Sequence, residues 1–121
     1  MRMRVEFSPS ANLIDAAITW GDHLYRAGDY RAAADAYEIA VDTATSADEP
    51  VRGTQTDPAW AKYQRANALL QLAEFDKSLE LLEEIAASNA PWASDAGLKA
   101  DYARVERRLR GYADLPTGQE G

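Results

Sequence analysis

The chain of 121 residues has no cysteine, a single histidine and no long apolar run. The absence of cysteine excludes disulfides, thiolate metal sites and cysteine nucleophiles. One histidine is too few for a histidine-rich metal site within one chain. No apolar run approaches the ~20 residues of a membrane helix, and the first residues lack the apolar core of a secretory signal. We therefore expect no metal, no cofactor and no membrane partner, and we expect a cytoplasmic location.

The chain is also short of positive charge. It has 13 Lys and Arg residues against 20 Asp and Glu residues, which gives a net charge of −7. Because an acidic chain repels phosphate backbones, we expect no nucleic-acid partner. The length suits one small domain, and 46% apolar with 27% charged residues is an ordinary globular balance. The acidic composition, rich in alanine, aspartate and arginine, suggests a bacterial protein.

Motifs for catalysis are missing as well. There is no glycine-rich phosphate loop and no G-x-S-x-G elbow. We interpret His23 as a surface residue and the acids within residues 80–85 as a charged outer face. Asp48, Glu49 and Asp57 lack the alternating oxygen ligands of a calcium loop. We therefore predict that the protein is not an enzyme; an activity of His23 with nearby carboxylates is the remaining alternative in that class.

The chain instead contains five segments with the apolar spacing of helices. Apolar and small residues recur at i, i+3, i+4 and i+7, which predicts helices at 9–27, 29–45, 58–72, 75–88 and 91–111. Pro9, Pro58 and Pro91 suit first helical positions. Gly28 is a suitable left-handed stop for the first helix, and Asp29 is a suitable cap for the second.

The remaining segments are a link, an arm and a tail. Residues 46–57 are polar, and we interpret them as a long inter-repeat loop. Residues 1–8 form an arm whose Met1, Met3, Val5 and Phe7 alternate with polar residues, as in a strand. This arm either lies frayed on the first helix pair or pairs with the same segment of a second chain. We predict that residues 9–111 are the folded domain and that 112–121 are a disordered tail.

Two stretches of the sequence share one residue pattern. The segments 27–41, "AGDYRAAADAYEIAV", and 72–85, "LAEFDKSLELLEEI", place Tyr30 and Phe75 at the same point, 45 residues apart. In each, a large aromatic opens a helix and is followed by small residues and then a bulky residue. Small residues let antiparallel helices approach, and the aromatics fill the space between them.

At these residues the chain resembles the tetratricopeptide repeat family. In the first unit Gly21 stands at the small helix-crossing position, "AGDY" at the inter-helix turn, and Tyr37 at the aromatic position of the second helix. In the second unit Ala66 and Phe75 match, while Ser78, Leu82 and Ile85 depart from the pattern. The resemblance covers about residues 11–110. It implies an all-α fold of antiparallel helix pairs, a short solenoid of two units closed by a capping helix.

The resemblance also implies a binding groove on the concave face, lined by the first helix of each unit. Transferring the register residue by residue predicts this groove at Ile18, Asp22, Tyr25, Arg26, Trp60, Tyr63, Asn67, Leu70, Gln71 and Arg104. The alternative for Trp60 and Tyr63 is that they pack on the long loop or on the capping helix. An aspartate at position 22 would repel a carboxylate, which argues against the chaperone-tail specificity of some family members.

We therefore expect a protein–protein interaction module that binds a peptide or a partner helix in this groove. The alternative is a structural homodimer, assembled through the N-terminal strand or through the capping helix. The distribution of charge is relevant to both hypotheses. Residues 74–84 carry five acids, and residues 99–110 carry five bases. These blocks either attract each other within the chain or leave the arginines to meet an acidic partner.

Overall fold

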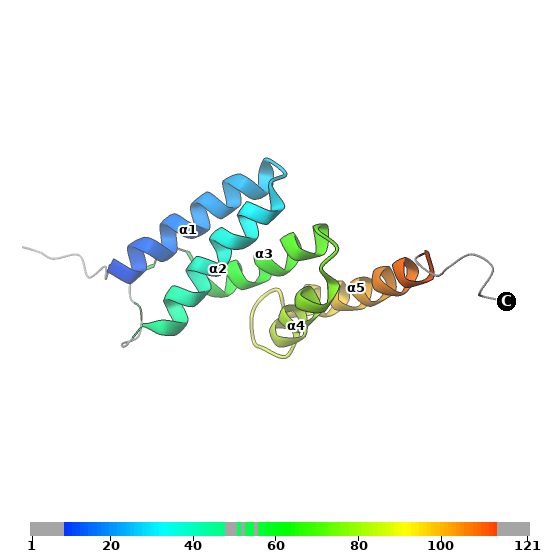
Figure 1. Cartoon of the computed structure of the whole chain (residues 1–121). Coiled ribbons are helices and arrows are strands. Elements are labelled where there is room, and N and C mark those ends of the chain that lie inside the picture. The colour runs from blue at the N-terminus through cyan, green and yellow to red at the C-terminus, as the bar shows by residue number, and fades with distance from the viewer. Residues whose placement is uncertain (1–8, 48–50, 52, 55, 114–121) are drawn as a thin grey trace, which may run out of the picture.

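The computed structural model describes residues 9–47, 51, 53, 54 and 56–113, and this part of the chain is all helical (Figure 1). Its five helices are α1 (Pro9–Arg26), α2 (Tyr30–Ser46), α3 (Pro58–Gln71), α4 (Phe75–Ala86) and α5 (Ala93–Ala113). They confirm the five predicted helices, with every end within two residues of its predicted place. The predicted strand at the N-terminus and most of the predicted tail lie outside the described residues.

The helices pack in the order in which they occur in the chain. α2 contacts α1 on one side and α3 on the other, and α4 likewise lies between α3 and α5. Figure 1 shows the resulting stack, which runs from α1 at one end of the molecule to α5 at the other. We call α1 with α2 the first unit and α3 with α4 the second unit. This succession of paired helices is a repeat-like all-α fold.

The turns inside the two units have the same hydrogen bonds. In the first unit the amides of Gly28 and Asp29 donate to the carbonyls of Tyr25 and Leu24. In the second unit the amides of Ala73 and Glu74 donate to Leu70 and Leu69 in the same way. Gly28 has a φ of +83°, which confirms its predicted left-handed conformation.

Small residues bring the helices of each unit together. Gly21 of α1 lies against the ring of Tyr37 of α2, as its predicted crossing position requires. A Cβ built on Gly21 would lie 2.7 Å from Cε1 of that ring, so only glycine fits there without displacement. Tyr37 is fully buried, and its hydroxyl donates to Asp22 Oδ1 at 2.5 Å. The two helices of the first unit thus pack together through an aromatic ring of α2 that lies against a glycine of α1.

The large apolar residues that give α5 its helical spacing face solvent. Leu98, Tyr102, Val105 and Leu109 are all more than half exposed. The face of α5 that packs on α4 consists of Ala96, Ala100 and Ala103, each at most 2% exposed. Leu13 and Trp20, which contribute to the apolar spacing of α1, are exposed as well. Alanine allows α5 to approach α4 closely, so the helix uses its small residues for the core and leaves its large ones outside.

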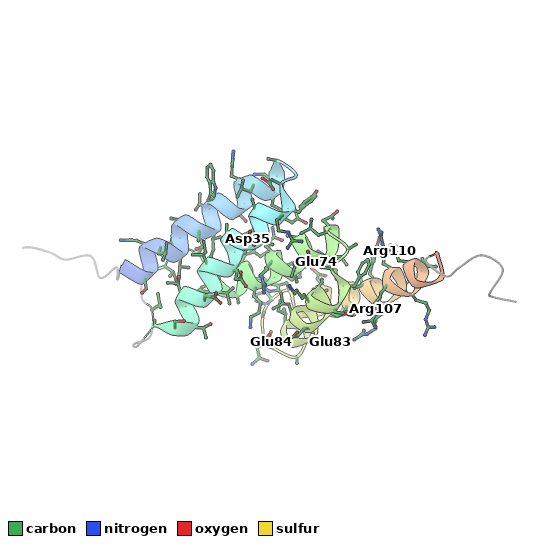
Figure 2. All side chains as sticks on the ribbon, in the orientation of Figure 1. Asp35, Glu74, Glu83, Glu84, Arg107 and Arg110 are labelled. Atoms are coloured by element: carbon green, nitrogen blue, oxygen red, sulfur yellow. The ribbon has the colours of Figure 1, made fainter. Side chains whose placement is uncertain are left out.

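Ion pairs join α5 to the acidic helix α4. Arg107 Nη1 lies 2.7 Å from Asp76 Oδ1, and Arg104 pairs with Glu83. Figure 2 labels Glu83 and Arg107 on these two neighbouring helices. The predicted attraction between the acidic and basic blocks within the chain is therefore confirmed for two of the arginines.

None of the described helices has the length and apolar character needed to cross a membrane.

Candidate functional site

A cavity of about 330 Å³ opens between the second unit and α5, next to the end of α1. We call it the α3–α5 groove. Its lining comes from α1, α3, α4 and α5. These residues are Tyr25, Asn67, Leu70, Gln71, Phe75, Lys99, Tyr102, Glu106 and Arg110.

A buried amide and a lysine form the polar centre of the groove. Asn67 is 5% exposed, and its Oδ1 accepts from Lys99 Nζ at 2.9 Å. The Nδ2 of Asn67 donates to Gln64 Oε1 at 2.8 Å, so the amide is satisfied on both sides. The Lys99 ammonium also lies 4.8 Å from the centroid of the Tyr63 ring. These contacts hold the charge of Lys99 in one place while leaving it protons to donate.

The rim of the groove is aromatic and positively charged. The Arg110 guanidinium lies 5.5 Å from the centroid of the Phe75 ring, and Tyr102 is more than half exposed. Lys99 and Arg110 outnumber the single acid, Glu106, in a chain of net charge −7. The groove is therefore a locally positive site with aromatic surfaces, suited to ligands that offer oxygen acceptors.

Tyr25 contributes a hydrogen-bonding group from α1. Its ring meets the ring of Tyr30 edge to face, with centroids 5.2 Å apart. Burial, followed by the neighbouring Tyr30, raises the pKa of the Tyr25 phenol above its ordinary value of 10.0. Like any tyrosine hydroxyl at neutral pH, it is protonated and can donate to a ligand.

Four of the predicted groove residues line this cavity: Tyr25, Asn67, Leu70 and Gln71. The assignment of Ile18 to the groove surface is wrong, because its side chain is fully buried in the core of the first unit. Asp22 is occupied by the Tyr37 hydroxyl. Arg26 is exposed at the end of α1 but does not line the cavity.

The predicted aromatic pair of α3 is covered by a third aromatic. The Trp60 ring meets Trp92 edge to face at 5.5 Å, and Tyr63 stacks on Trp92 at 6.0 Å. Trp92 lies immediately before α5, so the alternative of packing at the capping helix is the one observed. Arg104 is also outside the groove, since it pairs with Glu83 of α4 and with Asp101.

Sequence reasoning missed five of the lining residues: Phe75, Lys99, Tyr102, Glu106 and Arg110. Phe75 was interpreted as the aromatic that opens a helix, and the other four lie in the basic block of residues 99–110. A signal was nevertheless present, because positions 99, 102, 106 and 110 are spaced by three or four residues. Such residues share one face of a helix, and this face combines two cations with an aromatic.

A second cavity of about 330 Å³ lies between α2, α3, the end of α4 and the segment before α5. Its lining is largely apolar. The charged groups there, Lys62 and Glu84, already pair with each other, with Nζ 3.0 Å from Oε1. This cavity offers a ligand fewer unoccupied polar groups than the α3–α5 groove does.

The described residues contain no cluster of three or more side chains suited to hold a metal ion. His23 is exposed, and its ring stacks on Trp20 with centroids 4.9 Å apart. This agrees with the interpretation of His23 as a surface residue.

Comparison with known proteins gives no further constraint: no family model matches the chain, and neither curated proteins nor solved structures yield a match.

Proposed function

We propose that this protein is a protein–protein interaction module of the tetratricopeptide type, and that it binds a peptide segment of a partner in the α3–α5 groove. The observation that supports this most is the pair of cations, Lys99 and Arg110, held beside exposed aromatic surface in a cavity. The succession of paired helices, the turns with matching hydrogen bonds and the glycine crossing agree with the family resemblance.

The lining favours a peptide with oxygen acceptors in its middle and apolar groups beside them. Lys99 and Arg110 would donate to backbone carbonyls or to acidic side chains. Tyr25 and Tyr102 would supply contact area, since aromatic anchors dominate many interfaces. Glu106 is the one groove acid, and it would select against a second acidic residue at its position.

The proposal is tested by selecting ligands from a random peptide library displayed on phage and measuring their affinity by fluorescence polarisation. Replacing Arg110 with glutamate reverses one of the two groove charges, so we expect Arg110→Glu to weaken selected peptides by about 10-fold or more. The matched control is Lys77→Glu, the same charge change on an exposed residue of α4 outside the groove. We expect less than about a 2-fold effect from the control.

The proposal fails if the library yields no peptide that binds the intact protein. It also fails if Arg110→Glu and Lys77→Glu weaken the selected peptides equally, because binding would then follow net charge and not the groove. Circular dichroism of each variant checks that the helices are retained.

A further inference from the structure

The exposed side of α5 carries a continuous apolar stripe, made of Leu98, Tyr102, Val105 and Leu109, with exposures of 71%, 57%, 58% and 54%. These four residues are spaced by four, three and four positions, which is the spacing of the apolar seam in a coiled coil. The stripe lies opposite the alanine face that packs on α4. A second helix can therefore approach the stripe without displacing any contact between α5 and the second unit.

Charges beside the stripe are arranged for an antiparallel copy of the same helix. If two α5 helices cross in opposite directions, Leu98 faces the partner's Leu109 and Tyr102 faces the partner's Val105. Asp101 then flanks the seam opposite the partner's Arg108, and symmetry repeats this pair at the other end. Such flanking charges set the orientation of paired helices. In the parallel arrangement Asp101 would instead lie near the partner's Glu106, and like charges would meet.

Arg108 has no ion-pair partner among the described residues, in contrast to Arg104 and Arg107. It is exposed beside Val105, on the side of α5 away from the groove. Asp101 has only Arg104, which also pairs with Glu83. A second copy would thus give Arg108 an acidic partner without breaking an ion pair between α5 and α4.

The apolar residues exposed on α1 fit the stripe less well. Leu13 and Trp20 are exposed there. Among the described side chains of α1, however, the one exposed residue with a permanent charge is Arg26, which is positive like Arg108. A repeated contact between α1 of one copy and α5 of the next would also be head to tail, and such contacts generate rings or open chains of molecules. A two-fold pairing of α5 closes on itself.

We propose that the protein forms a homodimer in which the α5 stripes of two copies pack antiparallel, with Asp101 of each copy opposite Arg108 of the other. The stripe from Leu98 to Leu109 is only ~17 Å long. Such a contact is smaller than a standard interface of ~1,600 Å², so the dimer dissociates on dilution. The inference does not depend on a peptide in the α3–α5 groove, but the two sites share Tyr102, which lies at the edge of the groove.

Sedimentation velocity of the full chain from about 1 to about 300 μM tests the dimer. We expect the mass to rise from monomer to dimer over this range and to stop there. Val105→Glu places a charge in the seam of both copies and should raise the dissociation constant about 100-fold or more. The matched control is Ile39→Glu, because Ile39 is an exposed apolar residue of α2, 49% exposed, and is remote from α5. We expect this control to leave the dissociation constant within about 3-fold of the original.

Charge reversal tests the orientation. Asp101→Arg and Arg108→Glu each place like charges opposite one another in a homodimer, so we expect each variant alone to weaken the dimer by about 10-fold. Mixed together, the two variants restore opposite charges at both ends of the seam. We therefore expect the mixture to form a mixed dimer about as stable as the original one. A folding defect in either variant would not produce this recovery.

A chain that stays monomeric at the highest concentration overturns the proposal, as does a dimer that Val105→Glu and Ile39→Glu affect equally. A mass that grows beyond the dimer would indicate head-to-tail packing instead. Recovery of dimer strength in the mixture supports the antiparallel orientation, and its absence overturns that orientation.

Discussion

The two helix pairs of this molecule share one plan and differ at their crossing points. The turns superpose in sequence with an offset of 45 residues, and both make the same pair of backbone hydrogen bonds. At the crossing, the first unit has Gly21 under the ring of Tyr37. The second unit has Ala66 and Leu82 at the same offset, both fully buried. The smaller residue on the first helix, glycine instead of alanine, thus accompanies the larger residue on the second helix, tyrosine instead of leucine.

The difference has a consequence for the groove. In the first unit the Tyr37 hydroxyl requires an acceptor, and Asp22 provides it. In the second unit Leu82 has no hydroxyl that requires an acceptor. Asn67, which stands 45 residues after Asp22, therefore does not have to accept a hydrogen bond from it. Asn67 holds Lys99 instead. The position that accepts a structural hydrogen bond in the first unit is therefore available to position a groove residue in the second.

The largest effect should come from changing the crossing of the first unit into that of the second. Gly21→Ala places a Cβ against a buried ring, which costs about 1–3 kcal/mol, and helix propensity returns at most ~1 kcal/mol of this. Tyr37→Leu should cost about 2–4 kcal/mol, because it removes buried ring volume and a hydrogen bond. The double variant reproduces the Ala66–Leu82 pair, so we expect it to be more stable than the sum of the single effects predicts. Urea unfolding measures all three.

Gly97→Ala is the matched control for this experiment. A Cβ at Gly97 would meet only Ala86 Cβ at 3.8 Å, an ordinary contact, so the helix should be unchanged or slightly stabilised. Strict additivity of Gly21→Ala and Tyr37→Leu would show that the two crossings are not interchangeable.

A smaller effect is expected at the turns, where the two units have different residues in one conformation. Ala73 has a φ of +62°, and Gly28 has one of +83°. No atom lies within 4 Å of a Cβ built on Gly28, so Gly28→Ala should cost only the backbone strain, about 1 kcal/mol. Ala73→Gly relieves that strain but increases the entropy of the unfolded chain, so its stability should be unchanged or up to ~1 kcal/mol higher. Thermal unfolding of both variants decides the matter, and a loss of stability in Ala73→Gly would contradict the equivalence of the turns.

The smallest effect should appear at alkaline pH. Burial, followed by the hydrogen bond to Asp22, raises the pKa of the Tyr37 phenol well above its ordinary value of 10.0. The folded state therefore holds this proton more tightly than the unfolded state does. The resulting stability is complete below about pH 10 and declines as the pH rises above it, with a loss of about 0.4 kcal/mol at pH 10 itself. Urea unfolding from pH 8 to pH 10.5 should show a shallower decline for Tyr37→Phe, and identical slopes would contradict this assignment.

The sequence predicted much of the fold because its signals were local. Pro58, Gly28 and Asp29 mark helix ends through backbone geometry that does not depend on the rest of the molecule, and Gly21 marks a crossing by its size. The site was predicted in part, since Tyr25, Asn67, Leu70 and Gln71 line the groove.

The sequence did not determine the buried face of a helix where two of its faces have residues at the same helical spacing. In α5, both the alanines and the large apolar residues recur at helical spacing, and only packing decides which set is buried. Size alone would favour burial of the larger residues, whereas the close approach to α4 favours the smaller ones. Trp92 was missed for a different reason: it lies in the turn before α5, where no helical period extends.

The succession of helices also bears on how the chain acquires its structure. Each helix packs mainly on the one that precedes it, so most contacts join residues near one another along the chain. Folding then needs no distant segments to meet, and chains of low contact order fold within microseconds to milliseconds. During synthesis the first unit can fold before α5 has been made, and each later helix can then pack on a helix that has already folded.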